Sequence, residues 1–307
     1  MNAKVPVRMA HSVHQRLLNL ARASDRPFNE LLQYYAMERF LYRLAHTGYG
    51  EALLLKGALL LRVWGLPSAR PTMDIDLMGT KMFSPPELVA VVKESMSLVI
   101  DDGLIFHPET IAVEAIDQDA DYQGWRLLFR ANLGNARIHL QVDVGLGDVV
   151  VPAPVWIELP TQLDFPAPRL LAYTPESAIA EKFQAMVALE KVNSRMKDFY
   201  DLWALAQNLD FKGPLLQAAV RATFERRRTA VPERTPLALT PEFSDDPTKQ
   251  VQWAAFVRRL SSRETIIDLP EAVDVIRDFM MPPVLALSAG KSFRADWRPG
   301  GPWVSGE

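Results

Sequence analysis

The apolar positions of residues 12–46 recur at helical spacing and predict two helices. Ser12 and Gln15 have the spacing of a capping box, which would start the first helix at Ser12. Pro27 interrupts the pattern, and Asn29 is a residue type that caps a second helix. We therefore expect the chain to begin with a helical segment.

Residues 51–171 change to short apolar runs that are typical of strands. The runs predict strands at Thr72–Met78, Ile111–Ile116, Gln123–Asn132 and Ala136–Val144. The Leu-rich segment 51–66 indicates a helix, for which a short strand at Leu53–Leu55 is an optional start. The last run alternates strictly, so its aliphatic residues share one face and Asp143 lies on the other. Leu133-Gly134-Asn135 is typical of a hairpin turn between the last two strands. Ser84 and Glu87 form a capping box for a helix that continues to about Ile100.

Residues 172–307 return to helical spacing. Thr174 is a good N-cap and is followed by Pro175 at the first helical position. Further helices are predicted at Lys197–Gln207, Leu215–Arg228, Gln250–Leu260 and Leu269–Phe279. Residues 229–248 are typical of a loop, and the tail from Leu287 is expected to wrap or fray.

These patterns divide the chain into three parts. The parts are an N-terminal helical segment (1–50), a core with a sheet (51–171) and a helical C-terminal domain with a loop-like tail (172–307). The fold class is therefore α+β, with a small mixed or antiparallel sheet in the core.

Composition narrows the class of protein. Hydrophobic residues make up 49% and charged residues 23% of the chain, which is typical of a globular protein. The absence of cysteine excludes disulfide scaffolds, thiol nucleophiles and cysteine-ligated zinc sites. No apolar run approaches the roughly 18–20 residues that span a bilayer, and the N-terminus lacks a signal-peptide core. We expect a cytoplasmic protein without a membrane partner.

Charge is unevenly distributed although the chain is nearly neutral overall. The net charge is +4 in residues 1–50, −9 in residues 51–181 and +5 in residues 182–263. An acidic middle between basic segments favours a metal-binding core flanked by surfaces for a polyanion. Uneven surface charge without a function is the competing interpretation.

The sharpest chemical feature is the pair Asp74 and Asp76. Two carboxylates two residues apart point to the same face of a strand, where they could hold a hard divalent cation such as Mg²⁺ or Mn²⁺. Asp143, on the polar face of its own strand, would complete such a site. The alternative is that all three are ordinary solvated strand residues.

Two further groups of residues have the chemistry of phosphate contacts. Lys56-Gly57-Ala58 combines a cation with small residues at a strand-to-helix junction, where backbone N–H groups can approach a phosphate. Lys182 would emerge from an apolar helix face, where a cation requires an anion such as a triphosphate, Asp198 or Asp201. A purely structural ion-pair network, with Arg195 and Lys197 as further members, is also open.

Five separated elements occur in one order within residues 10–210. They are Lys56-Gly57-Ala58, Arg70-x-Thr72-x-Asp74-Ile75-Asp76-Leu77, Val142-Asp143-Val144-Gly145, Glu181-Lys182, and Asn193-x-Arg195-x-Lys197-Asp198-x-x-Asp201-Leu202. This set resembles the AbiEii/AbiGii-type toxin family, which includes the MenT-type toxins and belongs to the DNA-polymerase-β-like nucleotidyltransferases. The chain departs from many relatives at Ala58, where they have Gly or Ser, and at Thr72, where they have Ser.

The resemblance implies a role for each of these residues. Asp74, Asp76 and Asp143 would bind Mg²⁺, and Asp74, Asp76, Lys182 and Asp198 would form the catalytic set. Lys56, Gly57, Ala58, Arg70, Thr72, Arg195, Lys197 and Asp201 would contact the NTP. Asp198 or Asp201 would orient Lys182.

The resemblance also implies a function. The expected reaction adds a nucleotide, with a pyrimidine NTP as donor, to the 3′ end of tRNA and so blocks translation. The expected partners are tRNA and a cognate antitoxin protein. Transfer to a protein or small molecule is the alternative enzyme, and a binding module without turnover is the non-enzyme alternative.

One basic cluster is open to either interpretation. Arg226-Arg227-Arg228, together with Arg221, Arg258, Arg259 and Arg263, could be a solvated helix face or an RNA-phosphate surface.

Overall fold

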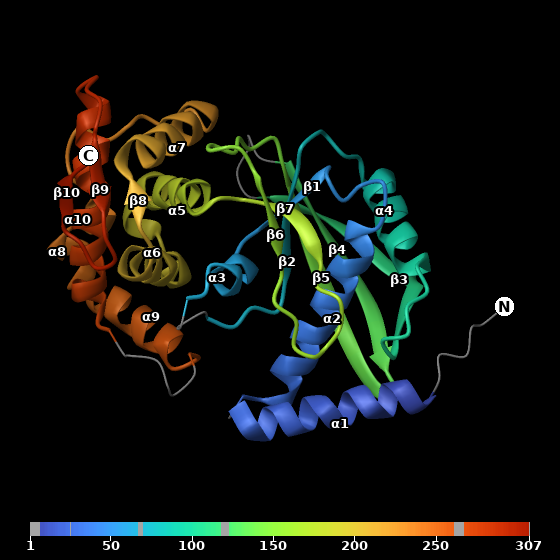
Figure 1. Cartoon of the computed structure of the whole chain (residues 1–307). Helices are drawn as coiled ribbons and strands as arrows, with labels where there is room; N and C mark the ends of the chain where they lie inside the picture. The colour runs from blue at the N-terminus through green and yellow to red at the C-terminus, as the bar shows by residue number, and fades with distance from the viewer. Residues whose placement is uncertain (1–6, 25, 67–69, 118–122, 261–266, 307) are drawn as a thin grey trace. The chain divides into compact units, whose positions relative to one another are not determined.

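The computed structural model describes residues 7–24, 26–66, 70–117, 123–260 and 267–306. The chain divides into two compact units (Figure 1). Unit 1 comprises Met1–Gly65, Pro71–Gly147 and Val155–Ala172, and unit 2 comprises Leu66–Arg70, Asp148–Pro154 and Tyr173–Glu307.

Unit 1 is built on a seven-stranded mixed sheet with the order β3-β4-β5-β2-β1-β7-β6. The strands are β1 (Leu53–Lys56), β2 (Ile75–Gly79), β3 (Leu104–Asp117), β4 (Gln123–Leu133), β5 (Ala136–Leu146), β6 (Val155–Glu158) and β7 (Arg169–Ala172). β2 runs parallel to β5 and β1 parallel to β7, whereas the other neighbours are antiparallel. The mixed sheet, the preceding helices and the helical C-terminal region confirm the predicted α+β class.

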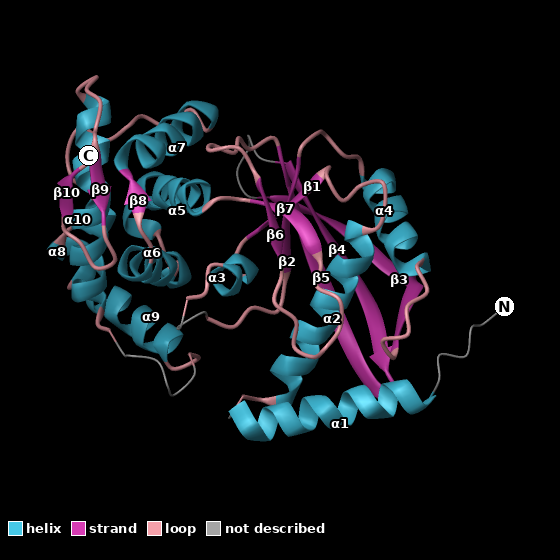
Figure 2. Ribbon diagram, in the orientation of Figure 1, coloured by secondary structure: helices cyan, strands magenta, loops and turns pink. Residues whose placement is uncertain are grey.

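The long strands β3, β4 and β5 form one side of this sheet (Figure 2). The alternation predicted for β5 is confirmed, because Ile138, Leu140, Val142 and Val144 are buried while the residues between them are not. Leu133 pairs with Ala136 across the two-residue turn Gly134-Asn135. Gly134 has a φ of +56°, which the turn requires and which glycine adopts without strain.

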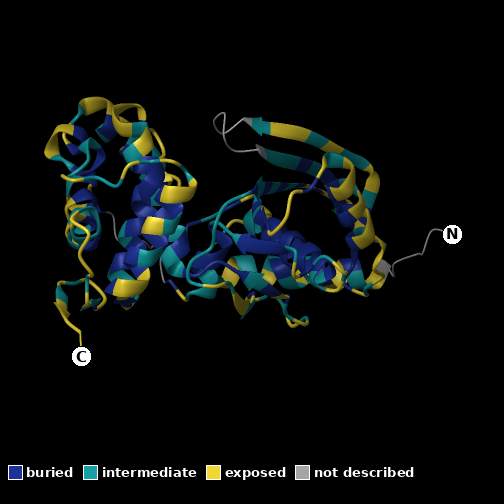
Figure 3. Ribbon diagram, turned by 90° about the horizontal axis from the view of Figure 1, so that it is seen from above, coloured by how far each residue is buried: buried dark blue, intermediate teal, exposed yellow. Residues whose placement is uncertain are grey.

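Helices cover one face of the sheet. They are α1 (Val7–Ser24), α2 (Phe28–Ala45), α3 (Leu59–Val63) and α4 (Pro85–Ser97). α2 packs on β5 and on α4, and α4 packs on β3 (Figure 1). Figure 3 shows the buried residues of unit 1 gathered where the sheet meets these helices. The capping box at Ser84 is confirmed, since the Ser84 N–H donates to the Glu87 carboxylate at 2.7 Å.

The N-caps predicted for the first two helices, Ser12 and Asn29, were both wrong. α1 begins at Val7, so Ser12 is an exposed residue inside the helix. The buried face of the helix includes Ala10, which comes before Ser12, so the helix starts earlier than the predicted cap. Pro27, in an extended conformation, is the N-cap of α2, and its carbonyl accepts from the Glu30 N–H at 3.0 Å, so Asn29 lies within the first turn.

One carboxylate on α2 lies in the core of unit 1. Glu38 is only 2% exposed. Its Oε2 accepts a hydrogen bond from the Gln162 N–H at 2.7 Å, and its Oε1 lies 3.4 Å from Nε of Arg39. Burial raises the pKa of Glu38 to about 8, and the Arg39 guanidinium opposes this rise only in part.

Unit 2 is mainly helical. Its elements are α5 (Pro175–Leu189), η1 (Glu190–Val192), α6 (Met196–Asn208), β8 (Phe211–Lys212), α7 (Gly213–Arg226), η2 (Leu237–Leu239), α8 (Pro241–Ser244), α9 (Pro247–Val257), α10 (Leu269–Ser288), β9 (Ala295–Trp297) and β10 (Trp303–Ser305). Thr174 caps α5 as predicted, because its hydroxyl oxygen accepts from the Ser177 N–H.

Two predictions for unit 2 were incomplete. The stretch 229–248 is not only loop, because it contains η2 and α8. These short helices form because Phe243 is buried and stacks on Phe199 with ring centroids 5.2 Å apart. Helix α10 extends beyond Phe279 and passes through Pro282 and Pro283.

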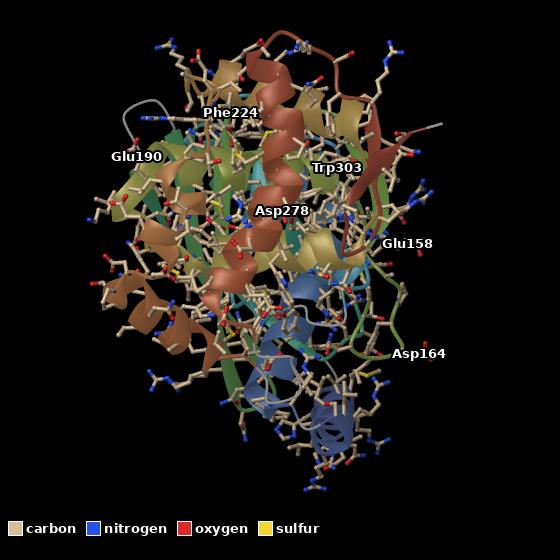
Figure 4. All side chains as sticks on the ribbon, turned by 90° about the vertical axis from the view of Figure 1, so that its left-hand side faces the viewer. Glu158, Asp164, Glu190, Phe224, Asp278 and Trp303 are labelled. Carbon is tan, nitrogen blue, oxygen red and sulfur yellow. The ribbon has the colours of Figure 1, made fainter. Side chains whose placement is uncertain are left out.

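The C-terminal tail forms strands and does not fray. β8, β9 and β10 make a three-stranded antiparallel sheet in the order β10-β9-β8. Pro283 has no N–H, so it leaves the carbonyl of Phe279, four residues earlier, without its helical donor. The indole N–H of Trp303 donates to that carbonyl at 2.9 Å, and the Trp303 ring stacks on Phe279. Figure 4 labels Trp303 and, on α10, Asp278, the residue next to Phe279. Tertiary contacts of this kind were not visible in the local pattern.

Within the described part of the chain, no helix has the length and hydropathy needed to span a bilayer.

Candidate active site

Strand register places five charged residues side by side across the sheet of unit 1. Glu114 of β3 pairs with Arg126 of β4, Arg126 with Asp143 of β5, Asp143 with Asp76 of β2, and Asp76 with Lys56 of β1. All five lie on the face opposite the buried aliphatic residues. The parallel pairing of β2 with β5 is therefore what brings Asp143 beside the Asp74–Asp76 pair.

Three carboxylates meet in this row. Asp74, Asp76 and Asp143 each offer an oxygen, and these oxygens all lie within 4.8 Å of one another. Asp74 does not lie on a strand as predicted, because β2 begins at Ile75. Instead, the Thr72 hydroxyl donates to Oδ1 of Asp74 and holds it next to the strand.

The donor set fits a hard divalent cation. Three carboxylate oxygens so close together repel one another, and a cation between them removes that repulsion. Oxygen ligands of this kind suit Mg²⁺ or Mn²⁺, which keep further positions for water or phosphate oxygens.

Gly57 lies directly beside this group, at the junction between β1 and α3. Its φ is +76°, a conformation that favours glycine. A Cβ at this position would lie 2.7 Å from the Cβ and Cγ of Asp76 and would overlap its Oδ2. Only glycine therefore lets the backbone approach Asp76 so closely. Ala58 follows as the N-cap of α3 and is buried.

Arg126 holds Asp143 from the neighbouring strand. Its Nε donates to Oδ1 at 2.9 Å and its second nitrogen donates to Oδ2 at 2.7 Å. Gln141 donates to the same two oxygens at 3.2 and 3.1 Å. The hydrogen bonds to Asp143 raise the pKa of the Arg126 guanidinium above its usual value. Asp143 is thus fixed in orientation by two donors on the polar face of the sheet.

The remaining predicted site residues form a second cluster, in unit 2. Nζ of Lys182 lies 2.8 Å from Oδ1 of Asp198 and 2.8 Å from Oδ2 of Asp201. Arg70 binds Asp201 through two hydrogen bonds of 2.7 and 3.0 Å. Nε of Arg195 lies 2.7 Å from Oδ2 of Asp198. Both Asp198 and Asp201 therefore orient Lys182.

The protonation states follow from these contacts. Burial alone would lower the pKa of Lys182, but Asp198 and Asp201 outweigh it, so the pKa is raised. For Asp201, burial would raise the pKa, but Arg70 and Lys182 outweigh it, so the pKa is lowered. Lys182 and Asp201 are therefore both charged near neutral pH.

This cluster has more cations than anions. Arg70, Lys182 and Arg195 face two carboxylates, and the Arg195 side chain remains 45% exposed. The surplus positive charge suits an anionic ligand. Lys197 is not a member of this cluster. Its side chain is exposed, and the carboxylate of Asp201 binds Arg70 and Lys182 instead.

Comparison with known protein families decides what these two clusters belong to. The sequence profile of the family described as "Nucleotidyl transferase AbiEii toxin, Type IV TA system" matches residues 39–277, which is more than half of the chain. The chain belongs to the AbiEii family. It is therefore a nucleotidyltransferase toxin of a type IV toxin–antitoxin system, which implies an antitoxin partner.

A solved structure shares the fold of this AbiEii-family chain. MenT4, a nucleotidyltransferase toxin from Mycobacterium tuberculosis H37Rv, has 19% sequence identity and a TM-score of 0.53, and the match covers 89% of this chain and 98% of that chain. JHP933 from Helicobacter pylori has 16% identity and a TM-score of 0.49, with coverage of 85% and 94%. A search of curated proteins found no significant match.

The three arginines at the C-terminal end of α7, Arg226 to Arg228, do not form one continuous face in the AbiEii-family chain. Arg227 is only 15% exposed and binds the Asp148 carboxylate at 3.1 Å and Gln184 Oε1 at 2.8 Å. Arg227 therefore connects the end of α7 to α5, through Gln184, and to the segment 148–154, through Asp148. Arg226 and Arg228 are exposed, and Arg263 lies outside the described residues.

Sequence patterns missed three residues that support the two clusters. Arg126 and Gln141 hold Asp143, and Lys249 of α9 donates to the Asn193 carbonyl at 2.7 Å. Asn193 Oδ1 in turn accepts from the N–H of Arg195 at 2.9 Å. The pairing of Arg126 with Asp143 could have been predicted from the sequence, because the two-residue turn at Gly134 fixes the register of the two strands. Lys249 offered no such signal, because its partner is a backbone carbonyl far along the chain.

Proposed function

We propose that this protein transfers a nucleoside monophosphate from an NTP to the 3′ end of tRNA in a Mg²⁺-dependent reaction. The product would block translation, which accounts for toxicity. The observation that carries the proposal is the meeting of three carboxylates within 4.8 Å in a chain of the AbiEii nucleotidyltransferase family. The nucleotidyltransferase activity follows from the family, whereas the acceptor, the nucleotide and the individual residue roles are our proposal.

The carboxylates hold the metal in this proposal. Asp74, Asp76 and Asp143 would be its protein ligands, and Gly57 keeps Asp76 in place by leaving room for its carboxylate. When bound, Mg²⁺ would neutralise phosphate charge and activate an oxygen nucleophile. Lys56, which pairs with Asp76 across β1 and β2, and Thr72, which donates to Asp74, complete this part of the site.

The cations of unit 2 would contact the triphosphate. Lys182 is held between Asp198 and Asp201, which fixes its ammonium group and keeps it charged. Arg195 is the most exposed cation of the cluster and would contact phosphate oxygens together with Lys197. Arg70 and Asp201 would support Lys182 from within the cluster.

The reaction itself is a single displacement at phosphorus. The 3′ oxygen of the acceptor forms a bond to the α-phosphorus, the bond from that phosphorus to the oxygen of the β-phosphate breaks, and pyrophosphate leaves. In such a reaction the protein contributes positioning and stabilisation of charge more than covalent chemistry.

The acceptor and the donor base rest on less direct support. Net positive charge in residues 1–50 and 182–263 favours a polyanionic acceptor over a small molecule. The preference for CTP or UTP follows from the family resemblance alone. Transfer to a protein or small molecule is the alternative, since it needs the same carboxylates and Lys182 but no basic surface.

Transfer of α-labelled CTP, UTP, ATP and GTP to total tRNA with Mg²⁺ tests the proposal. We expect label on RNA with a pyrimidine nucleotide, loss of that label with Asp74→Ala, and full activity with Asp101→Ala, an exposed carboxylate outside the site. Label on protein instead of RNA would support the alternative acceptor. Equal activity of the Asp74→Ala and wild-type proteins would rule out the proposed site.

A further inference from the structure

The open face of β4 and β5 carries basic side chains along a line that begins at the carboxylates. Arg126 stands opposite Asp143, Arg130 stands opposite His139 four residues further along each strand, and Arg137 stands opposite Asn132 beyond them. Arg130, Arg137 and His139 are exposed, whereas the residues that point to the other face, toward α2 and α4, are buried; these are Leu127, Phe129, Ile138 and Leu140. We call Arg126, Arg130, Arg137, His107 and His139 the basic strip.

Pairing within the strip runs against the usual pattern of antiparallel sheets. Arg130 lies between His107 of β3 and His139 of β5, so an arginine and two histidines stand in one row. Opposite charges paired across strands stabilise a sheet, yet neither cross-strand neighbour of Arg130 is acidic. A departure of this kind from what stability favours is typical of functional surfaces.

Acidic residues neutralise only part of the strip. Asp143 binds Arg126, Glu114 stands opposite Arg126, and the exposed Glu109 lies 3.2 Å from His107. For Arg130 and Arg137, the described residues include no ion-pair partner. The positive charge therefore grows with distance from the carboxylates.

The strip leads toward the basic helix α1. Six residues separate Asp143 from Arg137 on β5, which corresponds to about 20 Å of strand. Beyond Arg137 lies the turn at Gly134, where a Cβ would lie 3.9 Å from the Cβ of Ala10 in α1. The 18 residues of α1 contain arginines and histidines but no acidic residue. The end of β5 that carries Arg137 therefore lies next to a helix that contains no acidic residue.

We propose that this strip binds the phosphodiester backbone of the acceptor RNA and so directs its 3′ end to the carboxylates. The inference rests on the proposed function, because it assumes that the acceptor is RNA. A line of separated guanidinium groups matches a chain of regularly spaced phosphates, and about 20 Å spans about six stacked nucleotides at 3.4 Å each. An acidic protein partner would need no such regular line and is an outcome of the test.

Binding of fluorescently labelled tRNA to the full-length protein without NTP tests the strip separately from catalysis. The variants are Arg130→Gln, Arg137→Gln and the double variant, and the matched control is Lys93→Gln, an exposed cation on α4 that faces away from the strip. We expect each arginine variant to weaken binding about fivefold or more and to lower the slope of log affinity against log salt by about 1. Lys93→Gln should stay within twofold of the wild type.

The outcomes separate this inference from the proposed function. Arginine variants that raise KM for tRNA but keep kcat support both proposals. If transfer to tRNA proceeds while affinity, salt slope and KM match those of Lys93→Gln, the strip is refuted and the proposed function stands. If tRNA binding depends on the two arginines but no nucleotide is transferred, the strip stands and the proposed function fails. Binding of an acidic protein but not of tRNA through Arg130 and Arg137 would overturn the RNA assignment.

Discussion

Gly57 and Asp76 are in such close contact that a single methyl group at position 57 would overlap the Asp76 carboxylate. The backbone at Gly57 also has a φ of +76°, so its conformation and its surroundings both require glycine. The loop that the sequence indicates as a phosphate contact is therefore also a spacer that sets the position of one carboxylate.

Gly57→Ala should reduce activity and stability together. The added Cβ must displace Asp76, and the positive φ adds strain of about 1 kcal/mol. We expect a loss of at least tenfold in nucleotide transfer. Gly65→Ala is the matched control, since Gly65 has a φ of +69° but open space around it. This variant should lose only the stability that the backbone strain costs and should keep its activity. Equal activity of the two variants would mean that Gly57 does not position Asp76. The measurements are initial rates and urea denaturation.

Mg²⁺ or Mn²⁺ should stabilise the wild-type protein against thermal unfolding. A ligand at one hundred times its Kd adds about 2.7 kcal/mol to the free energy of unfolding. Asp76→Asn removes one charge from the carboxylate group and should abolish this metal-dependent rise in Tm, while Asp101→Asn should retain it. An unchanged response in Asp76→Asn would place the metal elsewhere. EDTA should return the wild-type Tm to its metal-free value.

Lys182→Met should destabilise unit 2. The change leaves Asp198 and Asp201 buried with one cation fewer, and breaking a buried pair in this way costs about 3 kcal/mol. Lys197→Met removes the same charge from an exposed site and should change stability by less than about 0.5 kcal/mol. Similar losses in chemical denaturation would show that the cluster contributes little to the fold. Activity of Lys182→Met should be read only under conditions where the variant is folded.

Stability should fall between about pH 5 and pH 8 because of Glu38. Its pKa is about 8 in the folded protein, so the folded state binds a proton that the unfolded state has already released. The stabilisation is therefore complete below the ordinary pKa of Glu and disappears as pH rises through about 8.

Glu38→Gln tests this assignment because glutamine stays neutral at every pH. The variant should flatten the pH profile and be more stable than the wild type at pH 8, by up to about 4 kcal/mol. Glu94→Gln, which changes an exposed residue of α4, should leave the profile unchanged. A Glu38→Gln profile that still falls between pH 5 and pH 8 would assign the proton to another group.

Trp303→Phe should cost about 1 kcal/mol in the free energy of unfolding. Phenylalanine retains the stacking on Phe279 but leaves the carbonyl of Phe279 without a donor. Trp156→Phe, at a side chain that is 48% exposed, should change stability by less than 0.5 kcal/mol. If the two variants are equally stable, water replaces the indole N–H at that carbonyl.

Local rules predicted the elements whose residues interact with near neighbours. The alternation of β5 and the caps at Ser84 and Thr174 depend on spacing within a few residues, and the structure confirms them. The short turn at Gly134 belongs to the same class. Hairpin register follows directly from such a turn.

Prediction failed where distant contacts decide the structure. Ser12 has the chemistry of a cap, but burial of Ala10 against the hairpin end extends α1 past it. Pro283 indicates the end of a helix, but Trp303, from the end of the chain, satisfies the carbonyl that Pro283 leaves free. Neither competing contact has a signal in the local sequence.

The candidate site shows the same division. The motif residues Asp74, Asp76 and Asp143 could be named from the sequence, and the parallel pairing of β2 with β5 that joins them could not. A cation on an apolar helix face needs an anion, which made Asp198 and Asp201 candidate partners of Lys182, and the structure shows contacts with both. The residue roles in catalysis remain predictions for the variants above.

The sheet formed by β8, β9 and β10 also has a consequence for biosynthesis. β9 pairs with residues 211–212, and Trp303 covers Phe279, so this aromatic core needs segments synthesised far apart in time. A ribosome must extend the chain to residue 303 before the core of the unit that carries Lys182 can close. A nascent toxin therefore lacks this aromatic core until residue 303 has been synthesised, and a chain terminated before that residue can never complete it.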